Sequence, residues 1–439
     1  MPDPFVIAIG LTLVVMLAAM AVGRAPLDVV RDWSRSGGLW TLLVFAMQMS
    51  LMLVLGTALA EAPAMRRGLA RIVGAARSPR GLVGLVALVA IVLALINWSL
   101  GLIGGALLAR EAGRLARARG WTLHYPLVCA AGYGGLMVWH GGLSGSAPLK
   151  GTTRADMVEV LGPELAARIG TIPLSESLFG GLNLWVSGGL LVLGPLVFML
   201  LTPPEGADPS AQPAPDDDVL LQHVDVIEAP PTTVVEGVER SAVVLWCLAV
   251  PMALALGLYV LDEGLLRIDF NTVNLALWCA AMLLHGRPGP FVRACETGIR
   301  GCTGILLQFP LYAGIMGMMT GAGLSSALTE ALVVAGPGVF AIVVFASAGL
   351  LNLLVPSGGG QWSVQGPILM AGALELGVEP GHAMMAMAYG DQWTNMLQPF
   401  WALPLLSITG VRARDIIGYT SLWMLVGGLW MMGVLWWWT

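Results

Sequence analysis

Long windows without any Asp, Glu, Lys or Arg are the feature that most restricts how this chain can fold. They cover residues 5–22, 36–60, 81–109, 120–149, 177–204, 241–261, 270–286, 301–329, 331–374, 392–411 and 416–439. A bilayer core about 30 Å thick is crossed by roughly 20 apolar helical residues, so most windows can hold at least one span. Transmembrane strands would need segments of about ten residues with alternating polarity, and the windows do not alternate. The sequence therefore predicts an all-α polytopic membrane protein.

The composition argues against several other classes of protein. Only 11% of the residues are charged, against about 25% in soluble domains. The 22 basic and 27 acidic residues give a net charge of −5, which argues against nucleic acid as a partner. The five cysteines form neither a CxxC pair nor a Cys/His cluster, so we expect no disulfide framework, no metal centre and no bound cofactor. The residues before window 5–22, Met-Pro-Asp-Pro, include no basic residue. We therefore interpret the window as a retained helix rather than a signal peptide.

Residues 202–240 interrupt the apolar pattern. They contain seven prolines and nine acidic residues but only one basic residue, Arg240. Such a segment buries too little apolar surface to fold alone. We interpret it as an acidic, Pro-rich linker of open role, followed by a linking helix at 241–261. It separates a first membrane region, 1–201, from a second, 262–439.

The two membrane regions resemble each other. Three groups of matching residues occur in the same order, at offsets of 260, 255 and 256 residues: Gln48 with Gln308, Asn97 with Asn352, and Tyr133 and Pro148 with Tyr389 and Pro404. Each match alone is weak, whereas three in register indicate an internal repeat.

Each repeat contains a window that fits ordinary spans poorly. Window 81–109 is too long for one span and too short for two, and its middle reads Asn97-Trp98-Ser99. Its counterpart at 337–375 has Asn352 and a Pro-Ser-Gly-Gly-Gly run near its middle. Polar residues at such midpoints predict re-entrant helical hairpins whose tips line a cavity. A flexible Gly turn between two ordinary helices is the alternative.

A discontinuous helix and a last span follow each predicted hairpin, and the linking helix then inverts the second repeat. Charge counting gives the orientation. With the N-terminus in the cytoplasm, fifteen basic residues fall on the cytoplasmic side and seven on the other. This is the positive-inside bias, so we expect a cytoplasmic N-terminus and an external C-terminus.

Two Gly-rich segments carry the most specific motifs. They read Trp-His-Gly-Gly-Leu-Ser-Gly-Ser-Ala-Pro at 139–148 and Pro-Ser-Gly-Gly-Gly-Gln-Trp at 356–362, the second followed by Gln-Gly-Pro at 365–367. Both segments, and almost the whole chain outside the linker, resemble the bacterial short-chain fatty acid transporter family, which belongs with the distant dicarboxylate/sodium symporters.

That resemblance implies a paired-hairpin fold in the inner membrane, a homodimer, and a rigid scaffold with a moving, elevator-like transport domain. It also implies cation-coupled carriage of small monocarboxylates such as butyrate or acetoacetate.

The residue chemistry agrees with that class. A carboxylate at the midplane must exchange water for fixed donors, because an isolated charge is costly in a low dielectric. Broken helices offer free N–H groups at their positive N-termini, and no Arg lies in a predicted span to replace them. The candidate substrate-binding residues are Asn97, Ser99, His140, Ser144, Ser146, Asn352, Ser357, Gly358, Gly359, Gly360, Gln361, Trp362, Thr394 and Asn395.

Several candidates have an ordinary alternative role. Trp98, Trp139 and Trp362 suit a short acyl tail, and equally suit helix packing. His140 fits either a functional role or a structural hydrogen bond.

Asp391 is the only acid well inside a predicted span. Intramembrane acids are functional by default, and we expect Asp391, with Asn97 and Asn352, to hold the coupling ion, sodium or a proton. The alternative is a helix-end residue that reaches water, since Asp391 lies 11 positions after Pro380.

Two other classes of function fit the sequence less well. A membrane-embedded enzyme could use His140 with Ser144 or Ser146, but no third orienting acid or metal cluster accompanies them. A channel needs a continuous polar pore or charged rings. A carrier of another small carboxylate, such as a dicarboxylate or an amino-acid-like anion, stays open. We therefore expect a transporter and not an enzyme.

Overall fold

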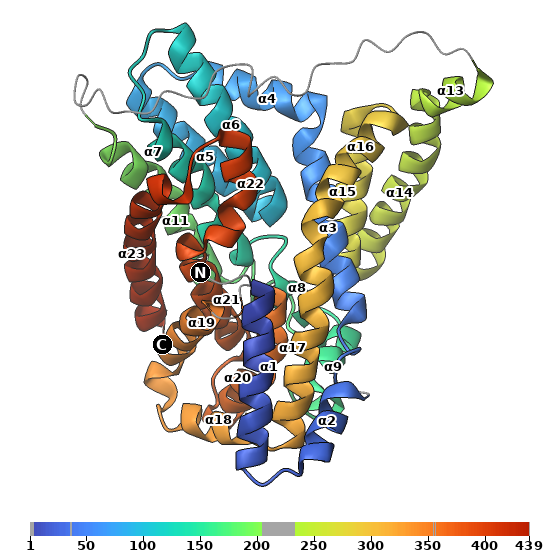
Figure 1. Cartoon of the computed structure of the whole chain (residues 1–439), viewed down its shortest axis with the longest axis vertical. Coiled ribbons are helices and arrows are strands. Elements are labelled where there is room, and N and C mark those ends of the chain that lie inside the picture. Colours follow the sequence, from blue (N-terminus) through green and yellow to red (C-terminus); the bar gives the residue numbers. More distant parts are fainter. Residues whose placement is uncertain (1–3, 36, 204–232, 354, 356, 439) are drawn as a thin grey trace.

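The computed structural model describes residues 4–35, 37–203, 233–353, 355 and 357–438. All regular secondary structure in these ranges is helical (Figure 1), which confirms the predicted all-α class. Of the predicted linker 202–240, residues 204–232 lie outside the described residues. Its described end carries a short helix, α13 (Val234–Glu239).

Most of the longer helices overlap the charge-free windows, whereas several of the shorter helices lie in the charged stretches between them. The longer ones are α1 (Pro4–Ala21), α3 (Leu43–Glu61), α5 (Pro79–Ile96), α6 (Trp98–Ala118), α11 (Gly181–Leu200), α14 (Ala242–Glu263), α15 (Phe270–His285), α17 (Thr303–Gly321), α19 (Pro337–Asn352), α20 (Gly358–Leu376), α21 (Pro380–Thr394) and α23 (Ala413–Trp438). The shorter ones are α2 (Pro26–Ser34), α4 (Pro63–Gly74), α7 (Tyr125–Tyr133), α8 (Ser146–Gly151), α9 (Arg154–Leu161), α10 (Pro163–Ile169), α16 (Pro288–Ile299), α18 (Leu324–Val333) and α22 (Pro399–Thr409). Within the described residues, six helical segments are long and apolar enough to cross a membrane.

Figure 1 shows two groups of helices side by side. In one group, α3 packs against α15 and α16, and α1 packs against α17. In the other, α5 packs against α6 and α11, and α19 packs against α21. The groups touch where α3 meets α6 and where α17 meets α20. The region between the groups is therefore built from distant parts of the chain.

One pair of helix breaks lies where hairpin tips were predicted. Asn97 separates α5 from α6, and its extended backbone lets its side chain cap the first turn of α6. α19 ends at Asn352, and Ser357 caps α20 by accepting a hydrogen bond from Gly360 N. Pro356 of the predicted second tip lies outside the described residues. The re-entry of the hairpins and the inversion of the repeats stay predictions.

A second pair of breaks interrupts the helices that follow. After α7 the chain forms two 3-10 turns, Gly134–Met137 and Trp139–Gly141, before α8 begins. α21 is followed by one such turn, Asn395–Leu397, and then by α22. These breaks place His140 and Asn395 outside regular α-helix, where side chains and backbone groups can contact a ligand.

Glycines let the helices cross closely. A Cβ on Gly105 of α6 would lie 2.2 Å from the carbonyl oxygen of Gly132 in α7, so no larger residue fits at this crossing.

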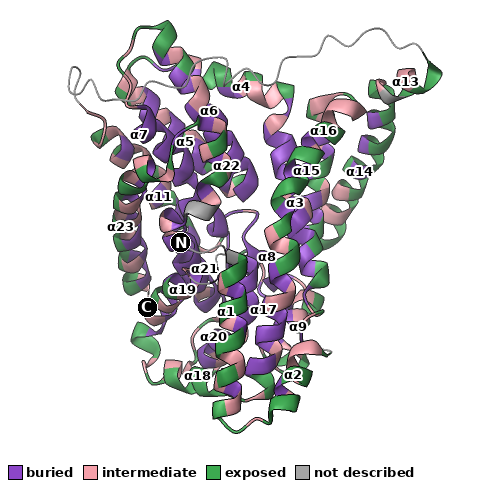
Figure 2. Ribbon diagram, in the orientation of Figure 1, coloured by how far each residue is buried: buried purple, intermediate pink, exposed green. Residues whose placement is uncertain are grey.

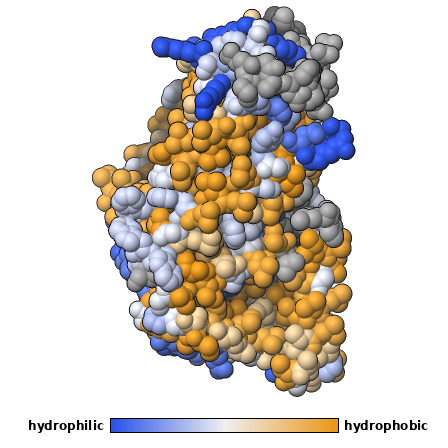
Figure 3. Space-filling view, turned by 90° about the vertical axis from the view of Figure 1, so that its left-hand side faces the viewer, coloured by the Kyte–Doolittle hydropathy of each residue, from blue (hydrophilic) through white to orange (hydrophobic). Residues whose placement is uncertain are grey.

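The molecule has a buried middle, an apolar exterior and polar ends, as a membrane protein requires. Buried residues concentrate along the middle of the molecule, and α14 is largely exposed (Figure 2). Apolar residues cover most of the face in Figure 3, and polar residues gather toward its ends. Leu200 and Leu261 are 72% and 81% exposed. An apolar exterior of this kind fits contact with lipid.

Candidate functional site

A narrow pocket lies where the two groups of helices meet. Its volume is about 20 Å³, room for little more than one water molecule. The lining is mostly apolar, with a few polar groups from the helix breaks: Met49, Trp98, Leu136, Trp139, Ile305, Phe309, Ser357, Gly358, Asn395 and Trp401. Apolar walls with a few fixed polar groups are typical of small-molecule sites. A short-chain carboxylate needs these walls to move apart.

Two helices begin at this pocket. Trp98 is the first residue of α6, and Gly358 is the first residue of α20. First turns carry N–H groups without intrahelical partners, and the helix dipole makes these ends positive. At α6, Trp98 N donates to Ser144 Oγ and Leu100 N to Asn97 Oδ1, so most first-turn donors there are already bonded. At α20, Ser357 Oγ accepts from Gly360 N, and the N–H groups of Gly358 and Gly359 precede it at the helix start. Two helix N-termini on one pocket suit an anion.

His140 and Asp391 form a buried pair next to the pocket. Trp139, a pocket residue, stacks on His140 with ring centroids 4.4 Å apart. His140 Nδ1 lies 2.7 Å from Asp391 Oδ2, and the two side chains are 0% and 1% exposed. Asp391 is therefore not a helix-end residue that reaches water. Ala147 N–H donates to His140 Nε2 at 3.1 Å, so the ring proton is on Nδ1 and is donated to Asp391.

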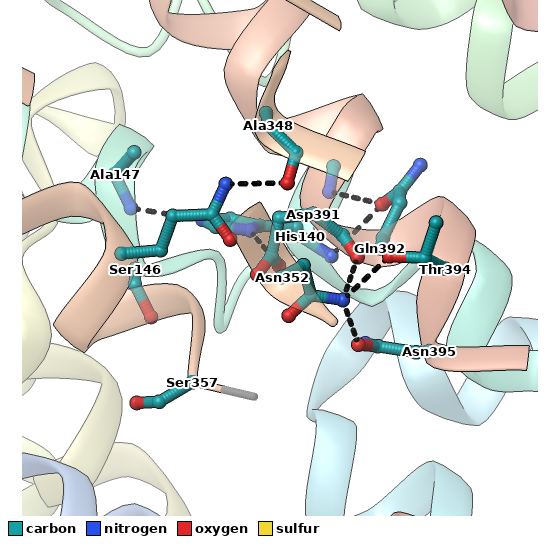
Figure 4. A network of polar contacts seen from close by, with 12 residues as sticks. His140, Ser146, Ala147, Ala348, Asn352, Ser357, Asp391, Gln392, Thr394 and Asn395 are labelled. Atoms are coloured by element: carbon teal, nitrogen blue, oxygen red, sulfur yellow. Dashed lines mark hydrogen bonds and ion pairs between the residues drawn. The ribbon is translucent and has the colours of Figure 1, made fainter. Parts of the chain in front are cut away.

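Asn352 joins the end of α19 to α21 (Figure 4). Its Nδ2 lies 2.6 Å from the Asp391 carbonyl oxygen, 3.0 Å from Thr394 Oγ1 and 2.7 Å from Asn395 Oδ1. Gln398 Nε2 donates to the Asn352 carbonyl. Four residues that the sequence predicts are thus in one polar cluster, and Asn395 connects this cluster with the pocket.

Two oxygens of this cluster could take up a cation or a proton. Asp391 Oδ1 and Asn352 Oδ1 are buried and have no hydrogen-bond partner in the part of the chain that the structure describes. An unpaired buried oxygen is costly, and carboxylate and amide oxygens fit a proton or a hard cation such as sodium. Among the described residues, Asn97 shares no hydrogen bond with either residue. The structure brings together two of the three predicted ion-coupling residues.

The predicted serines of the first repeat lie around the pocket without lining it. Ser144 Oγ accepts a hydrogen bond from Trp98 N at 2.9 Å. Ser99 Oγ donates to a backbone carbonyl of α3, and Ser146 Oγ donates to Met49 Sδ at 3.9 Å. These contacts attach the first break and the start of α6 to each other and to α3.

The predicted residues after Gly358 on α20 contact other helices rather than the pocket. A Cβ on Gly359 would lie 2.8 Å from Phe45 Cζ, and one on Gly360 would meet a side chain of α17. Gln361 Nε2 donates to a carbonyl of α19, and Trp362 is fully buried. The glycines here allow close packing of α20 on α3 and α17.

Two polar residues that the sequence analysis did not single out hold the breaks together. Gln392 Oε1 accepts hydrogen bonds from His140 N at 3.1 Å and Gly141 N at 3.2 Å. Asn183 Nδ2 donates to the Gly141 carbonyl, and its Oδ1 accepts from Tyr389 OH. Each of the two is an uncharged polar residue inside an otherwise apolar window of the sequence, and this is the signal that could have identified them.

The position of Lys150 differs from the one that charge counting predicts. Counting places it in an outer loop, whereas its side chain is 0% exposed in α8. Its Nζ lies 2.6 Å from Asp156 Oδ1 and 2.5 Å from Glu159 Oε2, and 4.5 Å from the Phe45 ring centroid. Two carboxylates and an aromatic face compensate for burial of the ammonium group.

Comparison with known proteins agrees with a transport site. The chain matches the family model described as short chain fatty acid transporter over residues 1–438. A protein of Escherichia coli (strain K12) is 38% identical, over 98% of this chain and 94% of its own. A protein of Haemophilus influenzae (strain ATCC 51907 / DSM 11121 / KW20 / Rd) is 37% identical, over 95% and 92%. Both carry the name of short-chain fatty acid transporters.

The chain belongs to the short-chain fatty acid transporter family. As a member of this family it is a multi-pass membrane transporter and not an enzyme. Two solved structures share its fold. The YdaH transporter of Alcanivorax borkumensis has a TM-score of 0.61 at 18% identity, with 99% of this chain and 98% of that chain covered. MtrF of Neisseria gonorrhoeae, described within a class of antimetabolite efflux pumps, has a TM-score of 0.58 at 14% identity, with 98% and 94% covered.

Proposed function

We propose that this protein is a secondary active transporter that carries short-chain fatty acids, such as butyrate or acetoacetate, across the bacterial inner membrane. The pocket at which α6 and α20 begin is the observation that carries the proposal. Its tryptophan, leucine and isoleucine walls suit an acyl tail of a few carbons, and the helix N-termini suit a carboxylate. Membership of the family supports the same cargo.

Neutral donors hold the carboxylate in this proposal. Ser357, Gly358 and Asn395 contribute to the described lining of the pocket, which contains no Lys or Arg. Binding by such groups is weaker than by a bidentate guanidinium. The modest affinity favours release of the cargo.

A sodium ion or a proton at Asp391 couples transport to a cation gradient. A second anion close to the cargo carboxylate repels it unless a cation or a proton lies between them. The unpartnered Oδ1 atoms of Asp391 and Asn352 support this position. Ala147 N–H donates to His140 Nε2, and His140 Nδ1 lies 2.7 Å from Asp391 Oδ2, so His140 orients the Asp391 carboxylate.

Transport proceeds by alternating access of the pocket. The group of α1, α3 and α14–α17 acts as the scaffold of a homodimer, and the group with α5–α7, α11 and α19–α23 moves against it in an elevator-like step. In this scheme α5–α6 and α19–α20 are the re-entrant hairpins of two inverted repeats. The small volume of the pocket supports the scheme, because loading requires its walls to separate.

Topology is testable at exposed positions. We expect a cysteine at Arg71→Cys to face the cytoplasm and one at Arg168→Cys to face outward, as the positive-inside bias predicts. An impermeant thiol reagent added to intact cells should label position 168 and spare position 71. Labelling of position 71 alone contradicts the proposed orientation.

Uptake of labelled butyrate into proteoliposomes tests the proposed function. A carrier should give saturable, unaltered butyrate accumulation that depends on an imposed sodium or proton gradient. A channel should give flux that does not saturate, and an enzyme should give a chemically changed product. Saturable uptake of a dicarboxylate or an amino acid, without uptake of butyrate, would show that the protein carries another small carboxylate instead of short-chain fatty acids.

A further inference from the structure

A groove between α4 and α6 lies outside the transport pocket and is lined by charged and apolar residues. Its volume is about 640 Å³. α4 contributes Ala70, Val73 and Gly74, and α6 contributes Glu111, Arg114, Leu115, Arg117 and Ala118. The groove has a fixed shape at one end, because Arg119 donates to the carbonyl oxygens of Gly74 and Ala76 and so ties the end of α4 to the end of α6.

Two arginines continue the lining of this groove by one helical turn. Arg66 precedes Ala70 by four residues on α4, and Arg110 precedes Arg114 by four residues on α6. Residues four apart share one face of a helix. This spacing aligns Arg66 and Arg110 with the helix faces that line the groove, one turn beyond its lining residues.

Both arginines have buried donor atoms without a partner. Within the described residues, Arg66 Nε and Arg110 Nε make no hydrogen bond. Burial lowers the pKa of Arg110, and the positive charge of Arg66 lowers it further, so the two guanidinium groups act on each other. Both charges also act on Glu61. Buried polar groups are normally hydrogen-bonded, and these two buried guanidinium donors without a hydrogen bond indicate an anion as their partner.

We propose that the groove between α4 and α6 binds the phosphate of an anionic phospholipid headgroup through Arg66 and Arg110. Arginine is the side chain that best matches phosphate oxygens. Val73 and Leu115 add apolar surface that glycerol and the first acyl carbons of a lipid cover.

Position favours a lipid over a soluble phosphate. α4 lies across one end of the molecule (Figure 1). Leu69 and Val73 of α4 are buried, whereas Arg67 and Arg71 are exposed. A helix with one apolar side and several arginines, at the end of an apolar belt, is typical of the membrane–water interface, where anionic headgroups are concentrated.

Thermal unfolding of the full chain in detergent tests the proposal. The probes are short-chain phosphatidylglycerol and phosphatidylcholine of equal chain length, because a ligand of the native state raises the melting temperature with its concentration. Arg66→Gln/Arg110→Gln removes both unpaired donors. Arg67→Gln/Arg71→Gln is the matched control, since it removes the same charge from the exposed side of α4.

We expect phosphatidylglycerol, and not phosphatidylcholine, to raise the melting temperature of the parent and of the control. The affinity for phosphatidylglycerol in Arg66→Gln/Arg110→Gln should fall about tenfold or more, since two charge-assisted hydrogen bonds are lost. Arg66→Lys/Arg110→Lys keeps the charge and should show a smaller loss, which separates binding from misfolding of the glutamine variant.

Three results overturn the proposal. One is an equal effect of the two lipids, and another is an equal loss in the control variant. The third is an equal shift produced by inorganic phosphate that also prevents the effect of phosphatidylglycerol, because it assigns the groove to a soluble phosphate.

Discussion

The start of α6 and the start of α20 are matching positions of the two predicted repeats, yet their surroundings differ. At α6, Asn97 caps the helix, and Trp98 N donates to Ser144 Oγ in the first break. Asn97, Ser99 and Ser144 are all fully buried. At α20, Ser357 caps Gly360 N within its own turn. Ser357 is partly exposed and lines the pocket.

This difference indicates that the start of α6 anchors the helix, whereas the start of α20 takes part in binding the cargo. The start of α6 is attached to a neighbouring element, so a change there should act mainly on stability. The start of α20 has its polar groups at the pocket, so a change there should act mainly on cargo. Asp391 connects the helix break around His140 with the end of α19. Its side chain contacts His140, and its carbonyl oxygen accepts a hydrogen bond from Asn352.

The largest effect is expected from Asp391→Asn. The variant cannot carry a charge-neutralising ion or proton, so it should lose uphill accumulation of butyrate while exchange or binding persists in part. Glu379→Gln is the matched control, since it neutralises an exposed acid at the start of the same helix. Proteoliposomes with an imposed cation gradient give the measurement. If Asp391→Asn concentrates butyrate as well as the parent does, the residue is structural.

A bulky residue at Gly359 should have the next largest effect. A Cβ added at Gly359 would lie 2.8 Å from Phe45 Cζ and 3.1 Å from Phe309 Cζ. Gly359→Val therefore forces the start of α20 to shift. Overpacking costs about 1–3 kcal/mol, and we expect butyrate uptake to fall about tenfold or more. Gly338→Val on α19 is the control, since no atom lies within 4 Å of the added Cβ. Equal uptake by the two variants contradicts close packing at Gly359.

Ser144→Ala tests the anchored side. The change leaves Trp98 N–H buried without its acceptor, which costs about 1–3 kcal/mol. We expect a lower melting temperature in detergent and a nearly unchanged affinity for butyrate in the protein that stays folded. A weakened affinity without loss of stability would assign Ser144 to the cargo instead.

Ser357→Ala tests the binding side and should have the smallest effect. We expect butyrate binding to weaken by about 1 kcal/mol, the net worth of one hydrogen bond, with a smaller drop in melting temperature than Ser144→Ala. Binding isotherms on both purified variants provide the comparison. Reversed results, with stability lost at Ser357 and affinity lost at Ser144, would exchange the roles of the two helix starts.

Much of the fold could be predicted because a bilayer excludes charges and a helix break needs particular residues. The charge-free windows locate the helices, and Asn97 and Ser357 locate two N-termini through their capping side chains. Asp391 is recognisable as the only acid well inside a predicted span. These inferences need only local sequence.

Contacts between distant segments could not be predicted in the same way. Gln392 reaches the backbone of residues 140 and 141, some 250 positions away, and nothing local to it indicates a partner. The burial of Lys150 was not predicted, because a charge count treats every lysine as solvated. Asp156 and Glu159, six and nine residues later, compensate its charge and allow burial. Asn97 and Asn352 match in sequence, but one caps a helix and the other ends one.

The central claim is that the cargo carboxylate binds at the pocket where α20 begins. Alkylation of Ser357→Cys in the presence and absence of butyrate tests it most directly, with labelling read at position 357 by mass spectrometry. Glu379→Cys, an exposed position just before α21, reports any general effect of butyrate on the reagent. We predict that butyrate slows labelling at 357, with half-protection near the concentration that half-saturates uptake, and leaves labelling at 379 unchanged. Equal rates at position 357 with and without saturating butyrate would contradict the account.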